Sequence, residues 1–327
     1  MEDTQKQDKL PPIKYTKRVG HLFEHVRDLD NLKEAIKDAA RHKRKRKEVQ
    51  KVLEDIDGHA LELQRMLDEE TFIPAKYTMR RINDGIQKKT RDIAIPRFWP
   101  DQCIHHAFVR IFKQIVLHSA YPFSCGCVPG KGTHGAKTAI EKWIRKDPKH
   151  TKYVLKLDVR KCYPTMNHEE LRKKLQRRIK DKKFLRLADR IIASFQQPMA
   201  THERLLPETD AVGIPVGLFT SPWFCNFFFQ DIDHKVAEKT GTAHNVRYVD
   251  DMVLFDSSKR RLHKALESEV KATKQTVKDN WQVFILSKRP LDFLGFKFHP
   301  NKTTIRKSIM LRISRKARTS RRRSLRI

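Results

Sequence analysis

Cysteines and long apolar segments are both scarce in this sequence of 327 residues. No uncharged apolar run approaches the roughly 18 residues that a membrane-spanning helix needs. The first residues are acidic and rich in Gln, and they lack the basic segment and apolar core of a secretion signal. The five cysteines are odd in number and scattered, which is typical of reduced thiols and not of a disulfide framework. The sequence therefore predicts a cytoplasmic protein with no membrane partner.

Acidic residues are also few relative to basic ones. Lys and Arg number 70 against 39 Asp and Glu, a net charge of +31, while the 39% of hydrophobic residues suffice for a packed core. Residues 293–327 contain no Asp or Glu, and two further basic clusters lie at residues 41–47 and 172–183. Apolar residues recur every four positions through the last cluster, which predicts that it lies on one helix. Three clusters of one sign favour phosphate contacts with nucleic acid over a merely solvated surface.

Hydrophobic periodicity separates helical from extended segments. Helical spacing covers residues from about 22 to 70 and 101–116, while strand-like alternation covers 91–96, 153–158 and 246–255. A further helix is predicted to begin at Ser221, with Ser as N-cap and Pro at the first helical position. Its aromatic residues are assigned to the core and not to base stacking. They are Trp223, Phe224, Phe227 and Phe228.

Three carboxylates stand at the ends of predicted strands. In the strand that ends at Asp158, alternation places Val154, Lys156 and Asp158 on one face, which we expect to point away from the core. Asp250 and Asp251 lie between two apolar strands, where a hairpin turn would aim both side chains at a common point. Clustered carboxylates repel one another unless a cation lies between them, and hard divalent ions prefer oxygen ligands. Asp158 and Asp250 could therefore hold two Mg²⁺ ions for phosphoryl transfer.

An Asp-Asp pair alone is more often plain turn chemistry than a metal site. Here it belongs to an ordered set of four motifs, which are Asp-Val-Arg-Lys-Cys-Tyr-Pro at 158–164, Gly-Ile-Pro-Val-Gly-Leu-Phe-Thr-Ser-Pro at 213–222, Tyr-Val-Asp-Asp at 248–251 and Phe-Leu-Gly-Phe at 293–296. In the order and spacing of these motifs the sequence resembles a reverse transcriptase, from about residue 20 to residue 315.

The resemblance implies an α+β protein with the right-hand polymerase fold. Its parts would be fingers, a palm with an antiparallel sheet, a short helical thumb and a helical N-terminal extension. The implied boundaries are 1–72 for the extension, 73–151 for the fingers, 152–300 for the palm with a fingers-like insertion at about 170–212, and 301–327 for a basic partial thumb or tail.

The resemblance also implies an RNA-directed DNA polymerase and assigns its catalytic residues. Asp158, Asp250 and Asp251 correspond to the palm acids of the family, which together with the backbone carbonyl of Val159 would bind two Mg²⁺ ions, with Mn²⁺ as a substitute. The implied substrates are dNTPs, an RNA template and a DNA or RNA primer.

Other positions correspond to substrate contacts of the family. The nucleotide-binding set is Arg91, Lys89, Tyr163, Val216, Gly217 and Lys278, and the template–primer set is Lys131, Gly213, Arg312, Arg315 and Lys316. Arg91 would contact the incoming triphosphate, helped by Lys88 or Lys89. Tyr163 falls at the steric gate that excludes the ribose 2′-OH. Lys278 would protonate the leaving pyrophosphate.

Some details resemble one subgroup, the diversity-generating retroelements of bacteria and phages. Residues 125–134 resemble the fingers motif of bacterial reverse transcriptases, and Lys-Gly-Thr-His at 131–134 is close to the version in that subgroup. Val216 stands where group II intron and retron enzymes have Gln, and in the subgroup an aliphatic residue there accompanies misincorporation opposite template adenines. Ser221-Pro222, by contrast, is the form found in intron enzymes. The subgroup implies mutagenic reverse transcription and a small barrel-shaped accessory protein as a partner.

Two alternatives stay open at this point. One is a retron, group II intron-like or phage-defence reverse transcriptase. The other is a catalytically silent nucleic-acid-binding protein with the same fold, against which the three intact acids argue.

Overall fold

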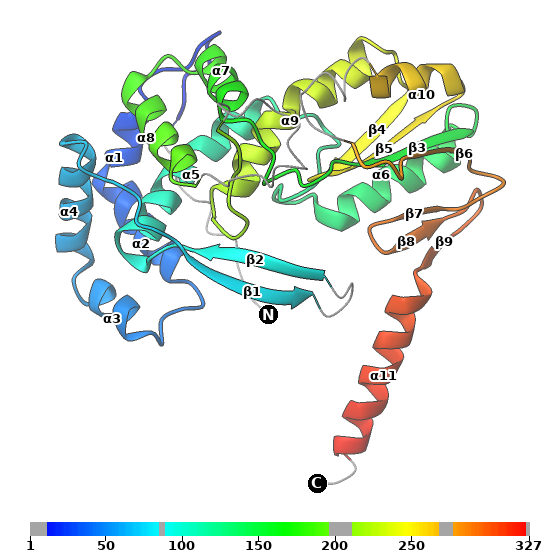
Figure 1. Ribbon diagram of the computed structural model, residues 1–327. Coiled ribbons are helices and arrows are strands. Elements are labelled where there is room, and N and C mark those ends of the chain that lie inside the picture. Colours follow the sequence, from blue (N-terminus) through cyan, green and yellow to red (C-terminus); the bar gives the residue numbers. More distant parts are fainter. Residues whose placement is uncertain (1–11, 85–88, 196–210, 268–276, 325–327) are drawn as a thin grey trace. The chain divides into compact units, whose positions relative to one another are not determined.

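The structure is a computed structural model that describes residues 12–84, 89–195, 211–267 and 277–324 (Figure 1). The chain divides into two compact units, each assembled from two stretches of sequence. The first unit comprises Met1–Ala120 and Lys161–Phe228, and the second comprises Tyr121–Arg160 and Phe229–Ile327. The subdomain boundaries expected from the sequence stay a prediction.

Helices dominate the N-terminal part of the first unit. They are α1 (Leu22–Arg27), α2 (Leu29–Ala40), α3 (Lys47–Glu54), α4 (Ile56–Asp68) and α5 (Cys103–His118), the last preceded by the π-helical turn η1 (Phe98–Gln102). Asp28 and Asp55 start α2 and α4 by accepting hydrogen bonds from backbone N–H groups of the first helical turn. The predicted helical character of both regions is confirmed. The basic residues 41–46 form the turn between α2 and α3.

The basic cluster at 172–183 does not lie on one helix, and that prediction is wrong. Helix α7 (His168–Arg178) ends before Ile179, and α8 (Lys182–Ala193) begins after it. Ile179 is extended because its backbone pairs with Val19, and the Asp181 side chain caps α8 by accepting from the Phe184 N–H at 3.1 Å. Strand pairing and a new N-cap therefore override the four-residue spacing.

Aromatic side chains form the core of the first unit. The rings of Phe108 and Phe184 stack with centroids 4.8 Å apart, and the ring of Phe112 lies 5.4 Å from those of both Phe224 and Phe227. Phe224 and Phe227 belong to α9 (Ser221–Glu238), whose predicted start at Ser221 and core assignment are confirmed. The unit also contains an antiparallel hairpin of β1 (Thr78–Asp84) and β2 (Lys89–Ile95).

A four-stranded antiparallel sheet forms the centre of the second unit. Its order is β4-β5-β3-β6, from β4 (His244–Tyr248), β5 (Asp251–Asp256), β3 (Tyr153–Asp158) and β6 (Gln282–Ile285). Helix α6 (Gly132–Lys146) runs along one face of this sheet (Figure 1), and α10 (Lys259–Ala265) contacts β5 and β3. The predicted strands are confirmed.

One expectation about the face of β3 is wrong. Alternation predicts that Val154 shares a face away from the core with Asp158, yet Val154 is fully buried in a cluster with Ile140 and Trp143 of α6. Leu155 and Leu157 are buried on the alternate positions. Both faces of β3 are thus covered at its start, and the carboxylate of Asp158 lies at the less buried end.

The second unit continues into a smaller sheet and a basic helix. Strands β7 (Leu291–Phe293), β8 (Phe296–Phe298) and β9 (Thr303–Ile305) form an antiparallel sheet, and α11 (Lys307–Ser324) extends away from β9 (Figure 1). Phe293 and Phe298 pack into the same core cluster as α6.

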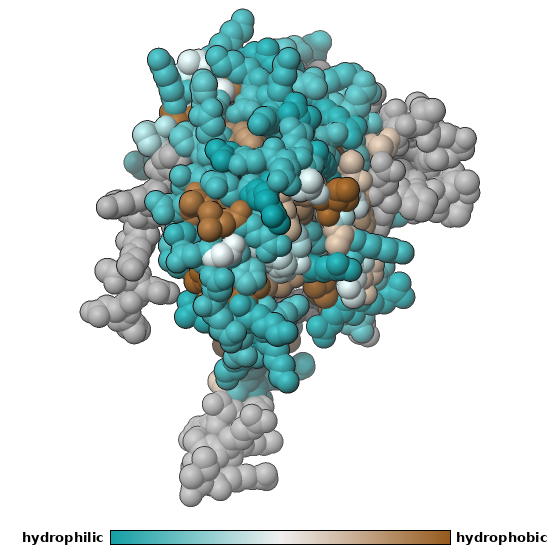
Figure 2. Space-filling model, turned by 90° about the vertical axis from the view of Figure 1, so that its left-hand side faces the viewer, coloured by the Kyte–Doolittle hydropathy of each residue, from teal (hydrophilic) through white to brown (hydrophobic). Residues whose placement is uncertain are grey.

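The surface reflects the composition of the chain. On the face shown in Figure 2 hydrophilic residues predominate, and apolar residues form small separate groups. Among the described residues, no helix combines the length and the apolar character required to cross a bilayer.

Candidate active site

The three predicted acids come together at one end of the four-stranded sheet. Asp158 is the last residue of β3 and pairs in register with Asp251, the first residue of β5. Asp250 lies with Val249 in the turn between β4 and β5, and its carbonyl accepts a hydrogen bond from the Val159 N–H at 3.0 Å. The antiparallel register therefore brings the motif at 158 next to the Asp-Asp hairpin, as the sequence predicts.

Mutual repulsion and burial determine the electrostatics of this cluster. The pKa of Asp251 is raised from its ordinary value of 3.8 to about 6. Burial contributes most, the carboxylates of Asp158 and Asp250 add to it, and the charges of Lys156 and Lys278 oppose it. Lys278 donates from Nζ to Oδ2 of Asp158 at 2.5 Å and from its backbone N–H to the Asp158 carbonyl at 2.9 Å. Oδ1 of Asp158 is buried without a hydrogen-bond partner among the described residues.

These observations fit a site for hard divalent cations. A buried carboxylate oxygen without a partner and a neighbouring acid with a raised pKa both indicate negative charge that lacks full compensation. Within the described ranges, no set of three or more His, Cys, Asp or Glu side chains is already arranged to hold a metal ion. Asp158, Asp250 and Asp251, together with the carbonyl of Val159, are the groups that would bind such ions.

A buried ion pair beneath the hairpin was missed by the sequence reasoning. The side chains of Arg247 on β4 and Asp233 on α9 are 1% and 0% exposed. Nε and Nη2 of Arg247 donate to the Asp233 carboxylate at 2.7 to 3.0 Å. Nη2 also donates to Oγ of Ser124 at 2.7 Å, and Nη1 donates to the carbonyl of Val249 at 3.0 Å. The guanidinium thus joins α9, the segment around Ser124 and the turn that carries Asp250.

The segment 123–127 is held against the same hairpin by its backbone. Cys125 donates its N–H to the Arg247 carbonyl at 2.8 Å, and the Arg247 N–H donates to the Phe123 carbonyl at 3.1 Å. A Cβ on Gly126 would lie 2.4 Å from the Val249 nitrogen, so a larger residue does not fit there. The sequence did contain a signal. Arg247 occupies an apolar strand and Asp233 an apolar helix, and a buried charge requires a partner.

In the first unit, β2, which carries Arg91 and Lys89, contacts the 213–217 loop through Ala94. The Ala94 N–H donates to the Val216 carbonyl at 2.8 Å. Gly217 has a φ of +113°, and a Cβ there would lie 2.6 Å from the Ala94 carbonyl oxygen, so this contact requires glycine. Arg91 is exposed on β2 opposite Ile82. Lys89 is the first residue of β2, and Lys88 lies outside the described residues.

Tyr163 and Gly213 are joined through the other end of the same loop. The Ile214 N–H donates to the Tyr163 carbonyl at 2.8 Å, and the Gly213 N–H donates to the Met166 carbonyl at 2.9 Å. The His168 ring lies 2.6 Å from the Gly213 carbonyl oxygen. These contacts fix the loop backbone, while the roles of Tyr163, Gly213, Val216 and Gly217 toward a substrate stay predictions.

The remaining template–primer candidates lie in the second unit. Lys131 is the residue before α6, and its Nζ donates to the Pro122 carbonyl at 2.8 Å, so its ammonium supports the 121–131 segment. Arg312, Arg315 and Lys316 are exposed on α11. Their contacts with nucleic acid stay predictions.

Comparisons with known proteins agree with this arrangement. Residues 83–298 match the family described as "Reverse transcriptase (RNA-dependent DNA polymerase)". The putative COX1/OXI3 intron 2 protein of Saccharomyces cerevisiae is 24% identical over 148 residues, which are 45% of this chain and 16% of the yeast protein.

Solved telomerase structures from Candida tropicalis share the fold. The apo form has a TM-score of 0.51 at 12% identity, covering 70% of this chain and 47% of the telomerase chain. The form in complex with the TWJ fragment of telomeric RNA has a TM-score of 0.50 at 13% identity, covering 76% and 48%. This chain therefore spans about half of those chains and a smaller part of the yeast protein. The predicted α+β polymerase fold is confirmed.

The buried ion pair generates the first prediction. Arg247→Met leaves Asp233 buried without its partner, so we expect the free energy of unfolding to fall by about 3 to 5 kcal/mol. The double variant Arg247→Met with Asp233→Leu removes both charges and should recover most of this loss in urea denaturation.

Although the double variant should recover most of its stability, the hairpin turn that carries Asp250 should stay less well held than in the wild type. In the double variant the carbonyl of Val249 still lacks its donor, so amide hydrogen exchange of residues 246–252 should stay faster than in the wild type. If these amides exchanged at the wild-type rate in the double variant, Arg247 would stabilise the fold without holding the turn.

The raised pKa of Asp251 generates the second prediction. Because the folded protein holds this proton more tightly than the unfolded chain, the contribution of Asp251 to stability is present at about pH 4 and is lost as the pH rises through about 6. Asp251→Asn should therefore be more stable than the wild type at pH 7.5 without divalent ions, by on the order of 2 kcal/mol, and nearly equal to it at pH 4.

Urea denaturation with and without Mg²⁺ checks this expectation. Mg²⁺ should stabilise the wild type more than the variant and so narrow the difference at pH 7.5. If Asp251→Asn were less stable than the wild type at pH 7.5, repulsion of the Asp251 carboxylate by Asp158 and Asp250 would be contradicted.

Proposed function

Because the chain belongs to the reverse transcriptase (RNA-dependent DNA polymerase) family, we propose that it copies an RNA template into DNA by adding dNTPs to the 3′ end of a DNA or RNA primer. The observation that carries this proposal is the convergence of Asp158, Asp250 and Asp251 at one end of the antiparallel sheet. A catalytically silent binding protein would have no use for three mutually repelling acids.

In this proposal the acids bind the reacting groups through divalent cations. Two Mg²⁺ ions, or Mn²⁺ in their place, held by the three carboxylates and the carbonyl of Val159 would supply the positive charge that in-line phosphoryl transfer needs. The chain itself positions the carboxylates. The sheet fixes Asp158 and Asp251, and the buried guanidinium of Arg247 holds the turn that carries Asp250.

The substrate contacts are proposed from the family resemblance. Arg91, with Lys89, would bind the triphosphate of the incoming dNTP. Tyr163 would exclude ribonucleotides at the 2′ position. The backbone around Gly217 would contact the nascent pair, and Lys278 would protonate the leaving pyrophosphate.

The template and primer would be bound mainly through their phosphates. The exposed cations of α11, Arg312, Arg315 and Lys316, suit sequence-independent contacts with a nucleic-acid backbone. Lys131 and Gly213 would line the path of the template. The high net charge supports this mode of binding, because each phosphate contact releases counterions.

We propose further that the enzyme is the mutagenic reverse transcriptase of a diversity-generating retroelement, acting in the cytoplasm of a bacterium, and either host-encoded or phage-encoded. Val216 supports this subgroup, since its apolar side chain cannot donate a hydrogen bond near the template. The subgroup would add a small barrel-shaped accessory protein as a partner.

An intron-type reverse transcriptase is the second candidate. Two observations favour it, the similarity to a yeast intron protein and the Ser221-Pro222 start of α9. A repeated variable gene segment beside the coding sequence would support the retroelement, and a flanking intron RNA would support the alternative.

The catalytic assignment is tested by Asp250→Asn in a primer-extension assay on a defined RNA template. Loss of one carboxylate should lower the rate of synthesis by about a hundredfold or more while RNA affinity and folding stay near wild type. Asp30→Asn, which removes an exposed carboxylate of α2, serves as the matched control and should retain full activity. Wild-type synthesis by Asp250→Asn would exclude that residue from the catalytic site.

The retroelement subgroup is tested by sequencing the cDNA made by Val216→Gln. An amide at this position can hydrogen-bond, so we expect fewer errors opposite template adenines, with errors opposite other bases unchanged. Val216→Ile retains an apolar side chain and should keep the wild-type error spectrum. Equal adenine error rates in all three proteins would separate Val216 from fidelity.

A further inference from the structure

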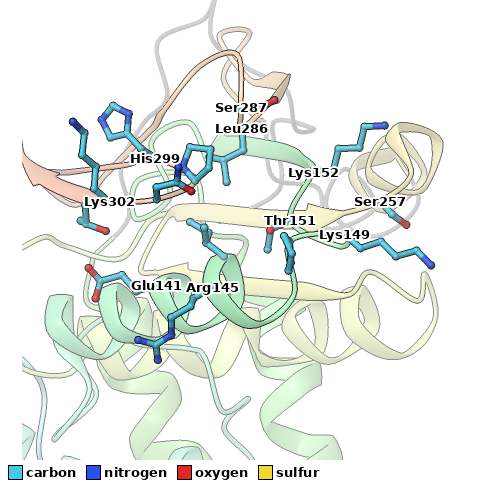
Figure 3. A pocket seen from close by; sticks show the side chains of 15 residues that line it. Glu141, Arg145, Lys149, Thr151, Lys152, Ser257, Leu286, Ser287, His299 and Lys302 are labelled. Atoms are coloured by element: carbon cyan, nitrogen blue, oxygen red, sulfur yellow. The ribbon is translucent and has the colours of Figure 1, made fainter.

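An open cavity of about 1070 Å³ lies within the second unit (Figure 3). It is bordered by the end of α6, the start of β3, the residues that follow β6 and the turn between β8 and β9. Its basic lining residues are Arg145, Lys149, Lys152, His299 and Lys302. No substrate contact proposed above uses these residues.

Basic side chains outnumber acidic ones in the lining of the cavity. Glu141 is the acid of the lining, and its carboxylate is already paired with Lys137 at 2.8 Å. Within the part of the chain that the structure describes, no ion pair joins Arg145, Lys149 or Lys302 to an acid. Like charges gathered around an open cavity repel one another, and an anion in the cavity would relieve that repulsion.

The arrangement of the cations favours an extended anion over a single phosphate. Figure 3 shows His299 and Lys302 on one side of the cavity and Lys149 and Lys152 on the opposite side, so they do not converge on one point. Ser257, Ser287 and Asn301 add hydroxyl and amide groups to the lining, which can bind phosphate oxygens and ribose hydroxyls. A strand with several phosphates would reach both sides at once.

The cavity lies away from the catalytic acids. Thr151 and Lys152 precede β3 and line the cavity, whereas Asp158 ends the same strand. With a rise of about 3.3 Å per residue, the six steps from Lys152 to Asp158 separate the two residues by about 20 Å. A strand bound in the cavity is therefore not the segment being copied.

We propose that this cavity binds the phosphate backbone of an RNA segment that lies outside the copied region and anchors the RNA to the protein. The choice of RNA as the polyanion rests on the proposed function, because an RNA template is its macromolecular substrate. The cations of the lining would contact phosphates and not base edges, so we expect the anchoring to be independent of sequence.

The test measures RNA binding by a cavity variant that combines Lys149→Gln, Lys152→Gln and Lys302→Gln. A control variant combines Lys235→Gln, Lys239→Gln and Lys259→Gln, and it removes the same charge from exposed positions in the same unit. The probe is a labelled RNA hairpin with a long single-stranded flank, titrated at several salt concentrations. A plot of log affinity against log salt concentration has a negative slope, and loss of three phosphate contacts should make that slope shallower by about 2 in the cavity variant. The control should keep the wild-type slope.

Asn301→Asp, which adds a negative charge at the cavity, should weaken RNA binding independently. An unchanged slope in the cavity variant would overturn the proposal. Binding of poly-glutamate that the cavity variant loses, with RNA binding intact, would also overturn it in favour of an acidic protein partner.

Primer extension on a short template–primer duplex separates this proposal from the proposed function. The cavity variant should extend the short duplex at the wild-type rate. Another outcome is that the wild type makes no DNA while the salt dependence of RNA affinity is still shallower in the cavity variant. In that case the polymerase proposal would fail and the anchoring site would stand.

Discussion

The buried ion pair between Arg247 and Asp233 is the interaction on which the geometry of the candidate active site depends. Two charges withdrawn from water are tolerated only when each is compensated, and here the guanidinium is satisfied by a carboxylate, a hydroxyl and a backbone carbonyl. Because that carbonyl belongs to Val249, the same pair that fills the interior also fixes the turn next to Asp250. Folding and the placement of Asp250, the proposed catalytic acid, are thereby coupled through one side chain.

The acids themselves impose the opposite constraint. Asp158, Asp250 and Asp251 are held close enough for repulsion to contribute to the raised pKa of Asp251, and Lys278 supplies partial compensation by pairing with Asp158. We expect a site built in this way to be less stable than one with neutral residues, and the proposed cations would relieve the repulsion. The buried ion pair and the repelling acids meet at the same hairpin turn, where Arg247 contacts Val249 and Asp250 follows.

Much of this arrangement could be predicted from local patterns. Alternating residues identified β3 and the hairpin, and an ordered set of motifs placed Asp158 beside Asp250. The apolar helix after Ser221 was also recognisable. Sequence spacing failed at Ile179, where pairing with Val19 breaks a regular helical pattern, and at Val154, which α6 buries from the other side. Both errors come from contacts with distant segments.

The partner of Arg247 and the basic cavity were missed for the same reason. In the sequence, Arg247 is an unusual charged residue in an apolar strand. Its pairing with Asp233 depends on the packing of α9 against β4, which the sequence does not show. Likewise, Lys149, Lys152 and Lys302 come from separate segments and form no linear motif. Local patterns predicted which acids lie together at the end of the sheet, whereas tertiary packing determines which residues position them.

Synthesis of DNA on an RNA template tests the central claim most directly. The purified protein would be incubated with a primed RNA of known sequence, dNTPs and Mg²⁺, and the products would be sequenced with and without a chelator. The account predicts DNA complementary to the template that disappears when the divalent ions are removed. Tight binding of the primed RNA with no DNA product, in Mg²⁺ or Mn²⁺ and with DNA or RNA primers, would contradict it.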